Sequence, residues 1–266
     1  MNPYQPPAHE AEAATAASAL GRPFTSVFGL LGDALSLYFG NLPTIAAITL
    51  SVFGPVDFLK CYLVHAANLE ENVAASARVE MAVEGVLGPL VTAALLVALV
   101  HKIRTGRAMR FRKAFARGFK HWGSVFGARF RSGLFIGLGL LLFVVPGLIW
   151  TVKYSLTDEI ATFEVDRSST RVLSRSAELT KGRAWKIFAV GLLAAIPVVG
   201  LQFAGGVVSG LAESWVVTAL VDCVGDVGYR FFVAVMLLVY LGSDPDARGE
   251  LLAKKRVKSE GAADGD

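Results

Sequence analysis

Three ionisable residues stand inside one long apolar stretch of the chain. Asp222, Asp226 and Arg230 occur within residues 215–241, which are otherwise mostly apolar or small. Their spacing of four places them along one side of a helix, where Asp226 and Arg230 could form an ion pair. In a membrane span, each such residue costs about 2.5–3.5 kcal/mol to insert and needs a partner or water.

Other apolar stretches also contain charges, and we predict that most of these charges meet inside one helix bundle. They could line a polar path or ion site, or they could form a structural network of ion pairs that fixes the order of the helices. Lys60 and Lys153 could instead extend toward the membrane surface. The predicted network comprises Asp57, Lys153, Asp158, Glu159, Asp222, Asp226 and Arg230.

The sequence lacks the spacings that usually carry catalysis or metal binding. Its four His and two Cys residues show no CxxC or HxxxH pattern, and Cys61 and Cys223 both lie in apolar stretches. Neither a phosphate-binding Gly-rich loop nor a GxSxG motif occurs. We therefore expect no metal, no cofactor, no nucleic-acid partner and no enzymatic activity.

The composition places these charges in a membrane protein. The chain of 266 residues is 54% hydrophobic and only 18% charged, with a mean hydropathy of +0.53. A soluble protein has about 25% charged residues. Four apolar stretches approach or exceed the roughly 20 residues that a spanning helix needs. They are residues 42–65, 83–100, 184–208 and 215–241.

A fifth apolar block, residues 132–163, is too long for one straight span and contains Pro146 and Gly147. This pair can kink a helix or turn a hairpin. The connections on both sides of the block are rich in Lys and Arg, which favours a cytoplasmic location for both. Trp150 would lie at the outer interface in a hairpin but mid-membrane in a kinked span. We predict a hairpin that turns at Pro146 and Gly147, with arms that could be short or partly re-entrant.

The two arms complete an all-α transmembrane bundle of about six spans, with both termini in the cytoplasm. A weak repeat supports this count, because an amphipathic stretch precedes the first, third and fifth spans. These stretches are residues 27–39, 109–122 and 168–181. The chain is thus predicted as three copies of an interfacial helix followed by a transmembrane hairpin. The predicted divisions are a disordered tail (1–22), a transmembrane domain (23–243) and a cytoplasmic tail (244–266).

The second amphipathic stretch is the most basic of the three. Phe111, Phe115, Phe119 and Trp122 form an apolar stripe, and the basic residues lie opposite. Such a helix can rest on an anionic leaflet and gain about 1 kcal/mol per basic residue, although the same charges can serve only to orient the spans. We predict contact with membrane lipids, including anionic headgroups, through Arg110, Arg112, Lys113, Arg117 and Lys120.

One part of the chain resembles a known family. Residues 140–147 and 153–156, with Arg175, Gly182 and Trp185 downstream, resemble the bacterial membrane-domain superfamily often attached to glycerophosphodiester phosphodiesterases. Stand-alone members are mostly uncharacterised multi-pass inner-membrane proteins. The catalytic barrel of those phosphodiesterases is absent from this sequence, so the resemblance implies a membrane module rather than an enzyme.

Two functional hypotheses remain open from the sequence. The first is a non-catalytic interaction or scaffold module in the bacterial inner membrane, in contact with lipid and with an unknown protein partner. The alternative is a small transporter or permeation pathway that uses the intramembrane Asp and Arg residues. The surroundings of Arg230 distinguish them, because closed ion pairs favour a scaffold and a hydrated cavity favours transport.

Overall fold

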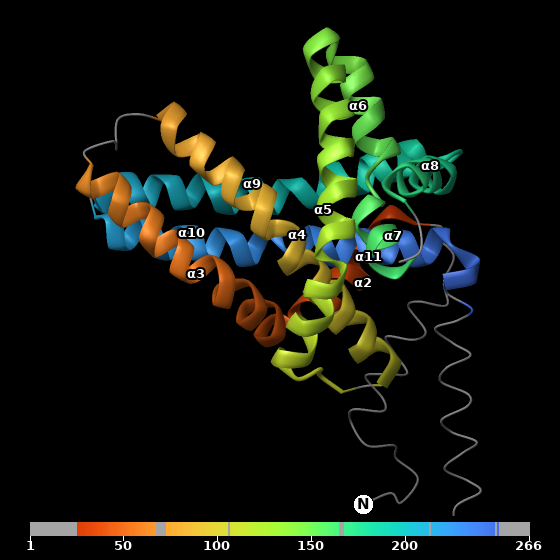
Figure 1. Cartoon of the computed structure of the whole chain (residues 1–266), viewed down its shortest axis with the longest axis horizontal. Coiled ribbons are helices and arrows are strands. Elements are labelled where there is room, and N and C mark those ends of the chain that lie inside the picture. Colours follow the sequence, from red (N-terminus) through yellow and green to blue (C-terminus); the bar gives the residue numbers. More distant parts are fainter. Residues whose placement is uncertain are drawn as a thin grey trace, which may run out of the picture.

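The computed structural model describes residues 26–67, 73–105, 107–164, 168–212, 214–247 and 249, which fold as a bundle of α-helices (Figure 1). The predicted all-α class is confirmed. The expected tail at residues 1–22 lies outside the described residues, as does most of the expected tail at 244–266. Five helical segments are long and apolar enough to cross a membrane: Leu42–Ala66, Arg78–Thr105, Phe111–Leu142, Ala184–Ala212 and Trp215–Ser243.

The first amphipathic stretch forms a helix of its own, α2 (Val27–Phe39). The Ser26 hydroxyl accepts a hydrogen bond from the backbone N–H of Gly29, which caps the helix start. The helix stops at Gly40, and α3 (Leu42–Ala66) begins directly afterwards with a proline in its first turn. The break at Gly40 thus separates α2 from α3, the first helix of spanning length.

The second amphipathic stretch is not a separate helix, unlike the first, but runs directly into the apolar segment that follows it. After α4 (Val73–Thr105), the single helix α5 (Phe111–Leu142) contains both the basic segment and the apolar segment that follows it. The junction has no proline and no break like the one at Gly40, so the backbone hydrogen bonds continue without interruption.

The predicted hairpin in the fifth apolar block forms, but its turn lies earlier than expected. The chain reverses at Phe143, whose extended backbone separates α5 from α6 (Val144–Lys153). Pro146 lies in the first turn of α6, where its missing N–H costs no helical hydrogen bond. Gly147 allows the arms to touch, since a Cβ on it would lie 2.7 Å from the backbone nitrogen of Leu140.

The second arm of this hairpin is much shorter than a span, so the described part of the chain has five helices of spanning length instead of the expected six. The ten residues of α6 rise about 15 Å, half of a bilayer core of about 30 Å. The chain nevertheless returns to the middle of α5, where the apolar arm of the hairpin begins, because Arg131 donates a hydrogen bond to Thr170 in α8 (Ser169–Thr180), 2.9 Å away. Both bases of the hairpin therefore lie on the same side.

The remaining helices follow the hairpin. They are α7 (Thr157–Phe163), α8 (Ser169–Thr180) and α9 (Ala184–Ala212), followed by α10 (Trp215–Tyr229) and α11 (Phe231–Ser243). The turn from α8 to α9 requires glycine, since Gly182 has a φ of 76°. The last two helices form one span with Arg230 at their junction.

Two spans form the centre of the bundle. In Arg78–Thr105 and Trp215–Ser243, 61% of the most apolar window is buried, against 22–28% in the other three spans. The peripheral spans thus keep most of their apolar surface for lipid. In Figure 1, α3, α4, α9 and α10 extend toward one end of the molecule, while the α5 and α6 hairpin projects away from them.

Candidate functional site: an intramembrane charge network

Arg230 is the most deeply buried cation among the described residues. Its side chain has no exposed surface, and its two terminal nitrogens donate to the carboxylate oxygens of Glu84 in α4 at 3.2 and 3.0 Å. The guanidinium carbon also lies 4.8 Å from the centre of the Phe53 ring of α3. This paired, bidentate geometry satisfies the two terminal nitrogens of the buried charge without water, whereas its buried Nε has no hydrogen-bond partner among the described residues.

A second arginine extends the network into α5 and α7. Arg129 forms an ion pair with Asp158 in the first turn of α7, and its Nη1 lies 3.4 Å from Glu84. It also donates to the Thr92 hydroxyl at 3.2 Å. Two arginines thus face two carboxylates, so the group is neutral and joins α4, α5, α7 and the final span.

A separate cluster joins α3 to α10. Lys60 lies 2.8 Å from Asp222 and 3.5 Å from Asp57. Both cysteines donate to these carboxylates, Cys61 to Asp222 at 3.6 Å and Cys223 to Asp57 at 3.7 Å. The lysine expected to extend toward the surface is instead 12% exposed, between two acids from different helices.

The predicted ion pair between Asp226 and Arg230 does not form. Arg230 reaches across to Glu84 instead, and the buried Oδ2 of Asp226 has no hydrogen-bond partner within the described part of the chain. Lys153, another predicted network member, is exposed at the end of α6 and lies over the ring of Tyr154. Asp57, Asp158, Asp222 and Arg230 therefore join ion pairs, and Lys153 stays outside the network.

Glu159 occupies a different environment from its neighbour Asp158. It is 2% exposed in α7, outside the five spanning helices, and its Oε2 lacks a hydrogen-bond partner among the described residues. Burial, with a smaller contribution from the charge of Asp158, raises the pKa of Glu159 to about 8. The carboxyl of Glu159 is therefore protonated in the folded protein at neutral pH.

A third group of charges ties the end of the last helix to α8. Arg175 lies 3.2 Å from Asp244 and 3.7 Å from Glu164, and Asp244 is 3% exposed. Asp244 also accepts hydrogen bonds from the backbone of Asp246 and Ala247. The folded part thus extends beyond residue 243, where the expected cytoplasmic tail begins.

The predicted lipid-contacting side chains all lie on the surface. Arg110, Arg112, Lys113, Arg117 and Lys120 are exposed, while Ala114 and Gly118 on the same helix turn inward. Phe111 and Phe119 of the predicted apolar stripe are also exposed, at 43% and 65%. The surface of this segment therefore offers both charge and aromatic rings.

Sequence reasoning missed the two residues that connect the network. Glu84 stands alone as an acid near the start of a long apolar run, and that isolation is a signal for an intramembrane partner. Arg129 was grouped with the basic connection before the hairpin because the apolar block was taken to begin at residue 132. Its contacts with Glu84 and Asp158 depend on how α4, α5 and α7 pack together, which the residue pattern does not show.

These contacts define an all-α, multi-pass membrane protein whose buried charges are largely closed into ion pairs. Among the described residues, no group of three or more His, Cys, Asp or Glu side chains could hold a metal ion. Comparison with protein-family models, with curated proteins and with solved structures finds no match to the chain.

Proposed function

We propose that this protein is a non-catalytic interaction or scaffold module of the bacterial inner membrane, with both termini in the cytoplasm. The observation that carries the proposal is the bidentate pair between Arg230, whose side chain is fully buried, and Glu84, whose side chain is 32% exposed. A conducting site needs charges that exchange partners with water or substrate, whereas these two charges are paired with each other.

Lipid contact through the basic segment of α5 is the second part of the proposal. Five exposed basic side chains beside exposed Phe111 and Phe119 match the composition of a helix that lies on an anionic membrane surface. Each basic residue near such a surface adds about 1 kcal/mol, which is screened by salt. The protein then prefers anionic over zwitterionic lipid around this segment.

Spin-labelled lipids in reconstituted membranes test this preference. The motionally restricted fraction of labelled phosphatidylglycerol is expected to exceed that of labelled phosphatidylcholine for the wild type. Replacement of Arg112, Lys113, Arg117 and Lys120 by Gln is expected to remove most of the difference. Neutralising Lys254, Lys255, Arg256 and Lys258 changes the net charge equally and serves as the control. An unchanged preference in the α5 variant, or an equal loss in the control, would contradict the proposal.

One observation favours the second candidate, a permeation pathway. The Oδ2 of Asp226 is buried without a hydrogen-bond partner among the described residues, on the helix that also holds Asp222 and Arg230. Ion or proton flux into liposomes distinguishes the candidates. Wild-type flux above that of empty vesicles, abolished in Asp226→Asn, would replace the scaffold proposal, and flux equal to empty vesicles rejects transport.

The resemblance to the membrane domains attached to glycerophosphodiester phosphodiesterases remains a prediction. It is compatible with the proposed role, because such a domain supplies membrane attachment and helix surfaces rather than catalysis. A partner that copurifies with the protein from bacterial membranes would support the interaction role, and its absence would leave lipid contact as the remaining support.

A further inference from the structure

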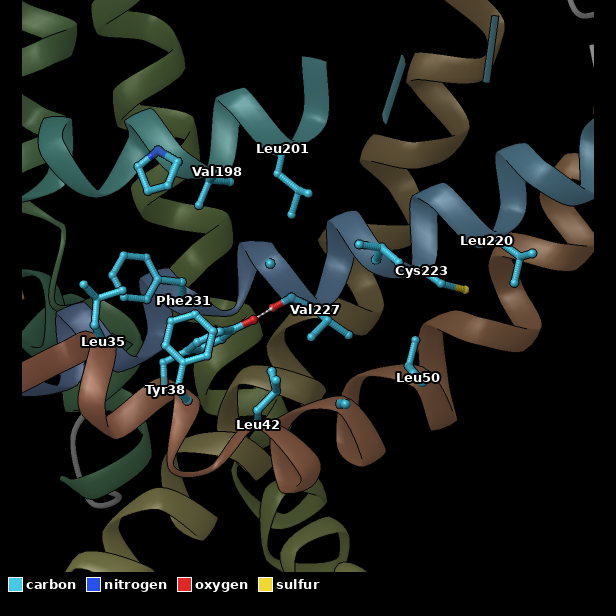
Figure 2. A pocket seen from close by; sticks show the side chains of 15 residues that line it. Leu35, Tyr38, Leu42, Leu50, Val198, Leu201, Leu220, Cys223, Val227 and Phe231 are labelled. Carbon is cyan, nitrogen blue, oxygen red and sulfur yellow. Dashed lines mark hydrogen bonds between the residues drawn. The ribbon is translucent and has the colours of Figure 1, made fainter. Parts of the chain in front are cut away.

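A cavity of about 630 Å³ lies between α2, α3, α9 and α10 (Figure 2), and its lining includes no residue of α5. Its walls are apolar, with Leu50, Leu201 and Val227 among the side chains that line it. This volume is within the range of about 300–1,000 Å³ typical of small-molecule pockets. The space is therefore large enough for a ligand rather than a packing defect.

The two polar side chains of the wall are already satisfied. The Tyr38 hydroxyl donates to the carbonyl of Val227 at 2.8 Å, as Figure 2 shows, and Cys223 donates to Asp57. An apolar cavity without free polar partners does not hold water well. The chemistry of the wall thus selects an apolar occupant.

The cavity opens on the side of the bundle that faces lipid. Leu50, Leu220 and Val224 line it and are themselves 38–57% exposed, although they belong to spanning helices. Exposed apolar surface on a spanning helix meets acyl chains rather than water. The bilayer is therefore the source of the occupant.

A cation lies beside the stretch of chain that supplies two of the lining residues. Lys102, at the end of α4, donates to the carbonyl of Gly40 at 2.6 Å, and Gly40 stands between the lining residues Phe39 and Leu42. An ammonium there is positioned at the level of headgroups, where the basic end of α4 is expected. It complements a phosphate whose chain enters the groove.

From these observations we propose that the groove holds an acyl chain of an anionic phospholipid, with Lys102 beside its phosphate. The inference rests on the proposed lipid-contacting function and adds a specific site to it. Apolar burial supplies little preference, because lipid tails are as apolar as the groove. Fit and the headgroup pair therefore determine occupancy.

Photolabelling in nanodiscs tests the site with a phosphatidylglycerol that carries a diazirine in its acyl chain. We expect labelled peptides from α3 and α10 in the wild type, and a loss of at least about fivefold in Ala46→Phe, which fills the groove. Ala47→Phe adds the same ring on the exposed side of α3 and is expected to label like the wild type. Lys102→Gln is expected to reduce labelling by phosphatidylglycerol toward that by the phosphatidylcholine analogue.

Equal labelling of Ala46→Phe and wild type would overturn the inference. If Ala46→Phe fails to fold, the wild-type map decides alone, and labelling no stronger in α3 and α10 than in the lipid-exposed hairpin contradicts the site. If the wild type shows no labelling in the groove but still prefers anionic lipid around α5, only this inference is removed. The reverse result would remove the proposed α5 surface and leave the groove.

Discussion

At the scale of single residues, Glu84 is the side chain on which the central network depends. Its removal leaves Arg230 buried without an anion, whereas Arg129 keeps Asp158. We expect Glu84→Gln to destabilise the protein by up to about 3 kcal/mol, at or below the lower end of the cost of breaking a buried pair, because the Glu84 side chain is 32% exposed. Arg230→Met is expected to cost less, because Glu84 keeps Arg129 as a partner.

Thermal unfolding in mild detergent measures this difference. Glu178→Gln is the matched control, because Glu178 is 69% exposed and lies 3.7 Å from Arg175. Its loss is expected to change the stability by less than about 1 kcal/mol. A Glu84→Gln variant as stable as Glu178→Gln would show that the buried pair does not hold the helices.

Glu159 gives the protein a pH dependence of known sign. Its pKa is raised from 4.5 in the unfolded chain to about 8 in the folded protein, chiefly by burial. The folded state therefore binds this proton more tightly, and the associated stability is complete below about pH 4.5 and is lost as pH rises to about 8.

We expect Glu159→Gln to make the unfolding temperature less dependent on pH between about 5 and 8. The amide has no proton to lose in this range but keeps a similar shape. Melting curves at four or five pH values compare the variant with the wild type. The same decline in both proteins would assign the pH dependence to another group.

At the scale of helices, the crossing of α4 and α5 depends on a small residue. A Cβ on Gly118 would lie 2.8 Å from the Cα of Ala94, whereas one on Gly123 would meet no atom within 4 Å. Gly118→Ala is expected to destabilise the protein by about 1–3 kcal/mol through overpacking. Gly123→Ala, on the same helix, is expected to be neutral or stabilising by up to about 1 kcal/mol.

Unfolding of both alanine variants under the same detergent conditions gives the comparison. The sign of the difference is the informative quantity, since helix propensity favours alanine at both positions. Equal stabilisation of the two variants would mean that α4 and α5 do not approach closely at Gly118.

Helix positions were predicted well from the sequence wherever a local signal ends an element. The amphipathic stretches predicted at residues 27–39 and 168–181 match α2 and α8, which end beside Gly40 and close to Gly182. The junction inside α5 carries no such signal, and the basic and apolar segments form one helix there. The hairpin turn was placed three residues late because Pro146 is tolerated in the first turn of a helix.

The sequence predicted which residues belong to the candidate site better than it predicted which residues pair with each other. An ionisable residue in an apolar run can be recognised from the sequence, as Asp57, Asp222 and Arg230 are. The identity of each partner depends on which helices pack together, and α4 reaches Arg230 only in the assembled bundle. Pairing within one helix, as expected for Asp226 and Arg230, competes with such contacts and here gives way to them.

At the scale of the whole molecule, the hairpin and the basic segments together predict how the chain is oriented in the membrane. The hairpin begins and ends on the same side. The chain segment before it, which includes the first half of α5, and the segment after it, which includes α8, both carry exposed arginines and lysines. In a bacterial membrane these connections are expected to face the cytoplasm. The short connection before Trp215 is then expected outside.

Cysteine labelling with a membrane-impermeant maleimide in spheroplasts measures this arrangement directly. The wild type is the blank, because Cys61 and Cys223 are buried. The account predicts that Ser214→Cys reacts in intact spheroplasts, and that Arg107→Cys and Lys181→Cys react only after the spheroplasts are permeabilised. Labelling of Arg107→Cys and Lys181→Cys from opposite sides would contradict it, because the chain would then cross the membrane between the two basic connections without returning.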